Sequence, residues 1–157
     1  MNTLSHILAA VALMASAVIY GTDVFCAIVQ RPALARVGDP ALTSVMGRVH
    51  EYGDRRLPLP GAVGIIAAAL AAITAAIAGR AAAAAAAAAA VTAQAAWLII
   101  YLRISAPVNH TLTAAAKAGH VPPDARSLQR RWDSVITARA ILQAAAAAAL
   151  CAALAVP

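Results

Sequence analysis

The stretch that decides the fold is Leu57–Gly79, LPLPGAVGIIAAALAAITAAIAG, which holds no charged residue over 23 positions. A helix needs about 20 mostly apolar residues to cross the hydrocarbon of a bilayer. A soluble alanine-rich helix bundle would instead need a polar face on this helix. Residues 61–78 offer Thr74 as their only polar side chain. The stretch therefore predicts a membrane-spanning helix.

Three further stretches lack charged side chains, namely Met1–Thr22, Ala81–Leu102 and Ala140–Pro157. Gly79 and Arg80 leave almost no linker between the helix predicted within Leu57–Gly79 and the helix that begins at Ala81, which predicts a tight helical hairpin. Hydropathy of this kind predicts an all-α fold, a four-transmembrane-helix bundle in a single integral membrane domain over residues 1–157, with the lipid bilayer as its surroundings. The helices are expected near residues 4–29, 59–79, 81–104 and 135–156.

The first segment also has features of a cleaved signal peptide. Ala15-Ser16-Ala17 matches a small-x-small cleavage site, but Met1–Thr3 carries no Lys or Arg, so the basic region of a signal peptide is missing. The apolar stretch also continues past the cleavage motif to Val29. These features favour a retained spanning helix over a signal peptide.

The net charge of +6 has an explanation in topology. Ten basic residues lie in the two long loops, whereas Arg80 alone lies at the opposite ends of the helices: Arg31, Arg36, Arg48, Arg55, Arg56, Arg103, Lys117, Arg126, Arg130 and Arg131. The positive-inside rule then predicts cytoplasmic loops and extracytoplasmic termini. The excess of Arg over Lys, with the alanine content, suggests a GC-rich bacterial gene and hence the bacterial inner membrane. Nothing resembles a nucleic-acid-binding motif.

The long loops are themselves expected to hold helices that form a cytoplasmic cap of helix extensions. Residues 40–56 show a helical stripe of apolar side chains: Leu42, Val45, Met46 and Val49. Pro107 is expected to end the third helix after Ser105. A short helix should then end at Gly119, and the last helix should begin at Asp124 and run unbroken into the fourth span.

Histidines and cysteines give one candidate pair. His50 and Asp54 are spaced i, i+4 and can share a helix face, where Asp54 would orient the imidazole of a catalytic base. The alternative is a solvated polar patch at the membrane surface. His110, beside Asn109, is expected at the mouth of the bundle, with or without a role, and His6 and His120 are interpreted as peripheral. No metal-ligand spacing occurs, and Cys26 and Cys151 are expected at different depths as apolar fillers, without a disulfide.

Two charged residues fall deep inside predicted spans. Asp23 lies about 12 Å in from Arg31 along the helix, and Arg139 lies at a comparable depth in the fourth helix. An acidic group at such depth usually faces a partner, so we predict that the two share one polar cluster, joined by Asn109. Alternatively, Arg139 snorkels to the interface. Trp132 and Tyr101 would belong to the interfacial aromatic belt or would line a pocket for a flat aromatic molecule.

Several short motifs together resemble a known family. These are Gly21-Thr22-Asp23 to Pro32, His50-Glu51-Tyr52-Gly53-Asp54-Arg55-Arg56-Leu57-Pro58, Pro107-Val108-Asn109, and Arg131-Trp132 with Arg139. Their order and spacing resemble the anthrone-oxygenase-like family of small four-helix membrane proteins, a domain family whose bacterial members mostly have no assigned function. Some fungal relatives oxidise an anthrone to an anthraquinone with molecular oxygen and are thought to need no cofactor. The alanine-rich hairpin of helices two and three is not part of that pattern.

Two functions therefore stand at this point. The first is a cofactor-independent monooxygenase acting on a flat phenolic, anthrone-like or quinol substrate. Its catalytic residues would be His50, Asp54, Arg139 and Asn109; its substrate-binding residues would be Trp132, Tyr101, Asp23 and His110. Neither a cofactor nor a metal is expected. The second is a non-enzymatic accessory subunit or small-molecule binder, in which the polar cluster locks the helices. Either function is compatible with a homo-oligomer or with another membrane protein as partner.

Overall fold

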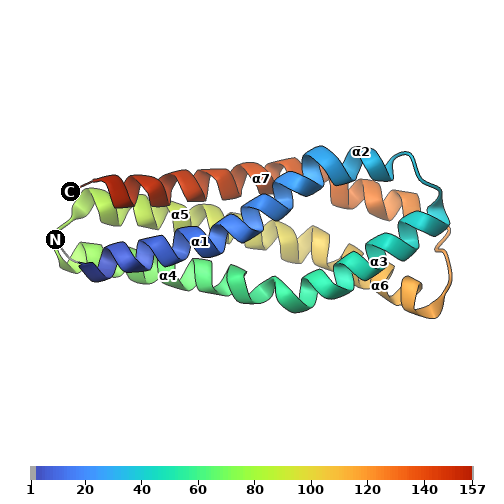
Figure 1. Cartoon of the computed structure of the whole chain (residues 1–157), viewed down its shortest axis with the longest axis horizontal. Coiled ribbons are helices and arrows are strands. Elements are labelled where there is room, and N and C mark those ends of the chain that lie inside the picture. The colour runs from blue at the N-terminus through green and yellow to red at the C-terminus, as the bar shows by residue number, and fades with distance from the viewer. Residues whose placement is uncertain (1–2, 157) are drawn as a thin grey trace. The chain divides into compact units, whose positions relative to one another are not determined.

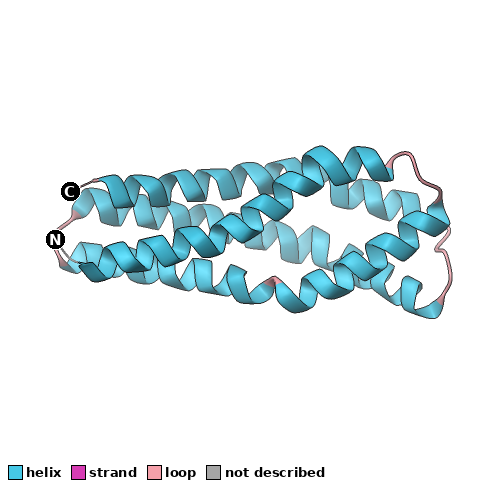
Figure 2. Ribbon diagram, viewed as in Figure 1, coloured by secondary structure: helices cyan, strands magenta, loops and turns pink. Residues whose placement is uncertain are grey.

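The computed structural model describes residues 3–156, and within this range the chain is all-α, without strands (Figures 1 and 2). Four of its helices have the length and the apolar composition needed to cross a membrane: Thr3–Leu34, Pro58–Ile77, Ala81–Ala118 and Ala125–Ala155. The predicted fold class is confirmed, and the chain is a multi-pass membrane protein by the length and composition of these helices.

Two of the spanning helices are longer than the sequence predicted. The first comprises α1 (Thr3–Phe25), the π-helix η1 (Cys26–Gln30) and α2 (Arg31–Leu34). The third comprises α5 (Ala81–Ile100), the π-helix η2 (Tyr101–Ser105) and α6 (Ala106–Ala118). The remaining helices are α3 (Asp39–Arg56), α4 (Pro58–Ile77) and α7 (Ala125–Ala155). As predicted, α7 runs unbroken from the loop into the fourth span.

The expectation that Pro107 ends the third helix was wrong. The helix widens into the π-turn η2, where the N–H of Ala106 donates to the carbonyl of Tyr101, and it resumes with Pro107 in the first turn of α6. A return from π to α geometry leaves one carbonyl without a donor, so the missing N–H of proline costs little there. The first helix uses the same device, with η1 placed directly before Pro32 in α2.

The chain divides into two compact units, which we describe separately. Unit 1 holds residues 1–21, 59–98 and 141–157, and therefore parts of α1, α4, α5 and α7. Its core consists almost entirely of alanine: Ala9, Ala12, Ala67, Ala68, Ala71, Ala87, Ala90, Ala146, Leu150 and Ala153. Small side chains let helix backbones approach closely, which is how helices associate in lipid.

One end of unit 1 carries the predicted tight hairpin and both termini of the described chain (Figure 1). Gly79 adopts φ +72°, a left-handed conformation that favours glycine. The guanidinium of Arg80 then donates to the Ser5 hydroxyl at 2.9 Å and to the carbonyl of Val156 at 2.8 Å. Its Nη2 also lies 3.1 Å from Nε2 of His6, a contact that the sequence did not indicate.

Unit 2 holds residues 22–58 and 99–140 and has larger core side chains. They come from the end of the first helix, α3, α6 and the first half of α7: Cys26, Leu34, Leu42, Met46, Val108, Leu112, Ala125, Trp132 and Ile136. The predicted stripe on α3 was half wrong, because Val45 and Val49 are exposed. The buried face is instead Leu42, Thr43, Met46, Gly47 and His50, since Gly47 lets α3 lie directly against Leu112 and Ala116 of α6.

Candidate functional site

Unit 2 brings together seven of the eight residues that the sequence singled out. Polar contacts and ring contacts link them across the end of α1, α3, η2, α6 and α7: Asp23, His50, Asp54, Tyr101, Asn109, Trp132 and Arg139. We call these residues the polar cluster. The eighth residue, His110, is exposed on α6 and takes no part in these contacts. Its predicted role in substrate binding stays a prediction.

The centre of the polar cluster is a buried ion pair. Nη2 of Arg139 lies 2.6 Å from Oδ1 of Asp23, and the two side chains are 7% and 1% exposed. Nη1 of Arg139 donates to the hydroxyl of Ser105 at 2.8 Å. The predicted pairing of Asp23 with Arg139 is thus confirmed, and Arg139 does not snorkel to a surface. Residue spacing did not single out Ser105, which enters the cluster because the π-turn η2 carries it.

Two aromatic rings lie against the Arg139 guanidinium. Its central carbon is 5.6 Å from the centre of the Tyr101 ring and 5.4 Å from that of Trp132. Both distances are within the range of a cation–π contact, which strengthens where water is excluded. The rings therefore help to hold a charge that is already balanced by Asp23. Trp132 is buried in unit 2, whereas Tyr101 is half-buried.

A chain of hydrogen bonds joins α7 to α3 through Asn109. The indole N–H of Trp132 donates to Oδ1 of Asn109 at 2.9 Å, and Nδ2 of Asn109 donates to Oδ1 of Asp54 at 2.8 Å. The same Asp54 oxygen accepts the hydroxyl of Tyr101 at 2.7 Å. Asn109 thus joins the cluster as predicted, although it does so through Trp132. The oxygen and the nitrogen of the Asn109 amide each take part in a hydrogen bond, which fixes the orientation of the amide group.

His50 belongs to the polar cluster, but the hydrogen bonds described above do not reach its ring nitrogen Nε2. The side chain is 4% exposed, and its ring centre lies 5.6 Å from that of Trp132. Nε2 is buried and has no hydrogen-bond partner among residues 3–156. Burial lowers the pKa of His50 to about 4, with Asp54 opposing and Arg139 reinforcing the shift. The imidazole is therefore neutral at physiological pH, and one of its two ring nitrogens is a hydrogen-bond acceptor.

Asp54 acts on His50 through its charge, which raises the pKa of the imidazole against the effect of burial. One of its oxygens accepts the bonds from Tyr101 and Asn109 described above. That arrangement holds the carboxylate firmly at the end of α3. Its predicted role of orienting the ring stays a prediction.

Within residues 3–156, no three His, Cys, Asp or Glu side chains are placed to hold a metal ion together. Cys26 is buried and Cys151 exposed, and both are free thiols.

The sequence also did not single out three polar residues that meet inside unit 1: Ser16, Gln94 and Gln143. The signal was available, because both glutamines interrupt long apolar stretches.

Comparison with known proteins adds no identity. No family model, no curated protein and no solved structure matches the chain. The function must therefore be argued from the residues of the polar cluster and their geometry.

Proposed function

We propose that the protein is a membrane-embedded, cofactor-free oxygenase that acts on a flat phenolic, anthrone-like or quinol substrate at the polar cluster. One observation carries the proposal: the buried, neutral His50 has no hydrogen-bond partner for Nε2 among the described residues. A buried polar atom without a partner is costly unless something else meets it. An enol or phenol hydroxyl, or an acidic C–H, would meet this nitrogen, and Trp132 would lie beside the ring of such a substrate.

The reaction needs no group beyond the substrate and oxygen. His50 takes a proton from the activated CH₂ of an anthrone-like substrate as general base. The resulting carbanion, delocalised as an enolate, adds to O₂ to give a peroxide, which the imidazolium protonates. The hydroperoxide then loses water, together with the second proton of the former CH₂ group, and leaves a carbonyl at that carbon. The balance is R₂CH₂ + O₂ → R₂C=O + H₂O, with O₂ as the oxidant.

The charge on the enolate oxygen would be stabilised by donors that the cluster already holds in place. The amide of Asn109 has two N–H groups, and its bond to Asp54 needs one of them. Arg139 contributes a fixed positive charge that Asp23 partly balances. Its delocalised cation lies against Tyr101 and Trp132, the two rings that we expect to contact the substrate.

A second function is favoured by a different observation, the internal pairing of the cluster. Asp54 accepts two hydrogen bonds and Arg139 has an acidic partner, so these groups are satisfied without a ligand. A protein that only binds a small lipophilic molecule, or an accessory subunit of another membrane protein, would use the same network as a structural lock. Oxygen consumption separates this alternative from the enzyme.

We further propose that the chain lies in a bacterial inner membrane with its long loops in the cytoplasm and both termini outside. The support is the excess of Lys and Arg in the loops over the single Arg80 at the opposite ends. A reporter fused after Pro157 that folds only outside the cytoplasm should be active. Activity at that position of a reporter that works only in the cytoplasm would contradict this orientation.

Oxygen uptake by the full-length protein, purified in mild detergent, tests the enzyme proposal. A panel of anthrones and hydroquinones should include at least one compound whose oxidation the protein accelerates above the no-protein rate. His50→Phe keeps a ring beside Trp132 but removes the base, and should abolish the acceleration. Val49→Ala, at the exposed neighbouring position, serves as the matched control and should retain it. Equal rates for the parent and His50→Phe would refute the role of His50.

A further inference from the structure

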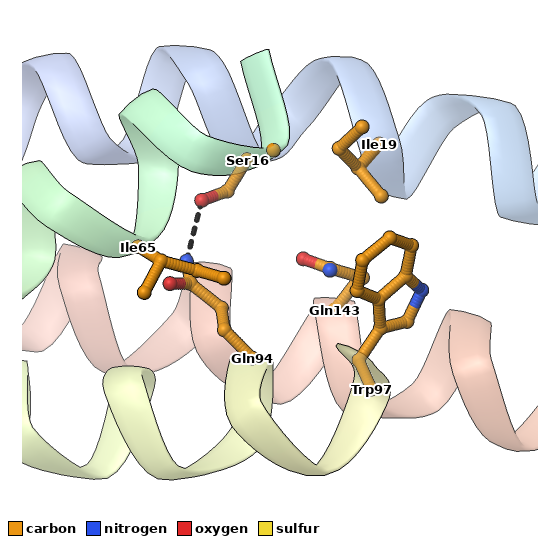
Figure 3. A pocket seen from close by; sticks show the side chains of 7 residues that line it. Ser16, Ile19, Ile65, Gln94, Trp97 and Gln143 are labelled. Atoms are coloured by element: carbon orange, nitrogen blue, oxygen red, sulfur yellow. Dashed lines mark hydrogen bonds between the residues drawn. The ribbon is translucent and has the colours of Figure 1, made fainter. Parts of the chain in front are cut away.

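Unit 1 contains a cavity that the proposed function does not use (Figure 3). It is a partly open cavity between parts of α1, α4, α5 and α7, with a volume of about 10 Å³, which is room for about one water molecule. Its lining combines apolar and polar side chains: Ser16, Ile19, Gly61, Ile65, Gln94, Trp97 and Gln143. Every helix that contributes to it is long and apolar enough to span a membrane, so its polar residues face a site surrounded by apolar side chains and lipid.

On the polar side of the cavity, α1, α4 and α5 lie in close contact. Nε2 of Gln94 donates to the hydroxyl of Ser16 at 2.7 Å. A Cβ on Gly64 would lie 2.9 Å from that hydroxyl oxygen, so the glycine is what lets α4 pass this close to α1. The bond between Gln94 and Ser16 fixes the amide, and its oxygen is directed away from Ser16.

Two amide oxygens in this cavity have no partner. Gln94 and Gln143 are 2% and 3% exposed, and Oε1 of each is buried without a hydrogen bond among residues 3–156. Figure 3 shows the amide of Gln143 extending into the cavity between Gln94 and Trp97. Buried polar groups in the hydrocarbon region must be satisfied internally, so two orphaned acceptors in one cavity call for a donor that residues 3–156 do not supply.

We propose that this cavity binds a hydroxyl group, which donates to the free oxygen of Gln143 when it belongs to an alcohol or phenol, and to the free oxygens of both Gln94 and Gln143 when it belongs to water. A hydroxyl suits the site because it is neutral and can both donate and accept. Water is one source of such a group. The other is a small lipophilic phenol or alcohol from the bilayer, whose hydroxyl would enter the cavity while its apolar body lies at the cavity's open side. The inference is independent of the oxygenase proposal, because it rests on residues of unit 1 alone.

Phenol and benzene are the probes that test the lipophilic source, since they share a ring and differ by the hydroxyl. Binding to the full-length protein in detergent is measured by equilibrium dialysis. Phenol should bind more tightly than benzene, and near-isosteric Gln143→Met should weaken phenol by about tenfold, the effect of one lost hydrogen bond. Thr92→Val, which removes a hydroxyl from the exposed side of α5, should leave phenol binding unchanged.

Water is tested by a crystal structure grown in a lipid phase without added ligand. Ordered density within hydrogen-bond distance of Oε1 of Gln94 or Gln143 identifies water as the occupant, and supports the proposal even where phenol does not bind. Gly61→Ile offers a second variant if a glutamine change prevents folding, because a Cβ on Gly61 meets nothing within 4 Å while the side chain fills the cavity. It should displace the bound phenol or water.

The proposal is overturned by either of two results. One is phenol and benzene binding equally tightly with no effect of Gln143→Met. The other is a dry cavity with no phenol binding, together with a Gln94→Met/Gln143→Met protein that melts at or above the parental temperature. Neither result bears on the oxygenase proposal, which is measured by oxygen uptake and depends on His50.

Discussion

Breaking the ion pair between Asp23 and Arg139 should destabilise the protein strongly, whereas removing both charges should not. The two groups are 2.6 Å apart and almost fully buried. Removing one partner of such a pair typically costs about 3–5 kcal/mol, because a charge is left buried alone, while replacing both by apolar residues is often close to neutral. For a chain of this size, that loss corresponds to a fall in Tm of roughly 6–20 °C.

The contacts of Arg139 also predict the order of the variants' melting temperatures. Arg139→Leu loses the contacts with Tyr101 and Trp132 as well as the bond to Ser105. The double variant Asp23→Leu/Arg139→Leu loses these too, which adds about 0.5–2 kcal/mol for the ring contacts. It should therefore melt slightly below the parent and well above either single variant.

Thermal unfolding in mild detergent, followed by circular dichroism, gives the double-mutant cycle. Arg48→Leu is the control, because it breaks an exposed pair with Glu51, in which Arg48 is 57% exposed; it should change stability by less than about 1 kcal/mol. Two single variants that melt like the parent would refute the buried pair. A double variant that loses the sum of both single effects would show that the residues act independently.

Three further predictions concern unit 2. Gly47→Ala should destabilise the protein strongly, because a Cβ there would overlap Ala116 and the backbone of Leu112, whereas Gly53→Ala meets only ordinary contact with a leucine side chain; equal melting temperatures would contradict the close packing of α3. Trp132→Phe should cost about 1–3 kcal/mol in detergent, since it keeps a ring but leaves a buried acceptor on Asn109 without its donor; an unchanged Tm would show that this bond is dispensable. The parent should lose about 3 kcal/mol of stability as pH falls from 6.5 to about 4, because His50 stays neutral in the folded protein while the same histidine in the unfolded chain takes up a proton. His50→Phe should remove that part of the pH dependence of stability. Identical pH profiles for the two proteins would refute a buried neutral His50.

Much of the fold could be predicted because its main determinant is the absence of charge. The apolar stretch Leu57–Gly79 leaves a helix as the form that satisfies its own backbone in lipid, and α4 spans most of it. The depth of Asp23 and Arg139 predicted their pairing by the same reasoning. Pro107 was misread because a π-turn, unlike an α-turn, tolerates a proline after it, and nothing in the local sequence announces that geometry.

The details of the site depend on packing that residue spacing does not encode. Val45 and Val49 fit a helical stripe, yet the buried face of α3 is set by Gly47, where α6 comes closest. Ser105 was missed because η2 rotates it into the cluster. Gln94 and Gln143 could have been noticed as polar residues in apolar helices, but that they meet in one cavity follows only from the arrangement of the helices.

The central claim is that His50 initiates the direct addition of molecular oxygen to a carbon acid, and isotope labelling tests it most directly. The purified protein is incubated with the best anthrone of the panel under ¹⁸O₂ in ordinary water, beside a no-protein sample and the His50→Phe variant. The expected product is a quinone whose new carbonyl carries one ¹⁸O atom, and only the parent protein should form it faster than the no-protein sample does. A new carbonyl oxygen that comes from water, or equal formation by parent and variant, would contradict it.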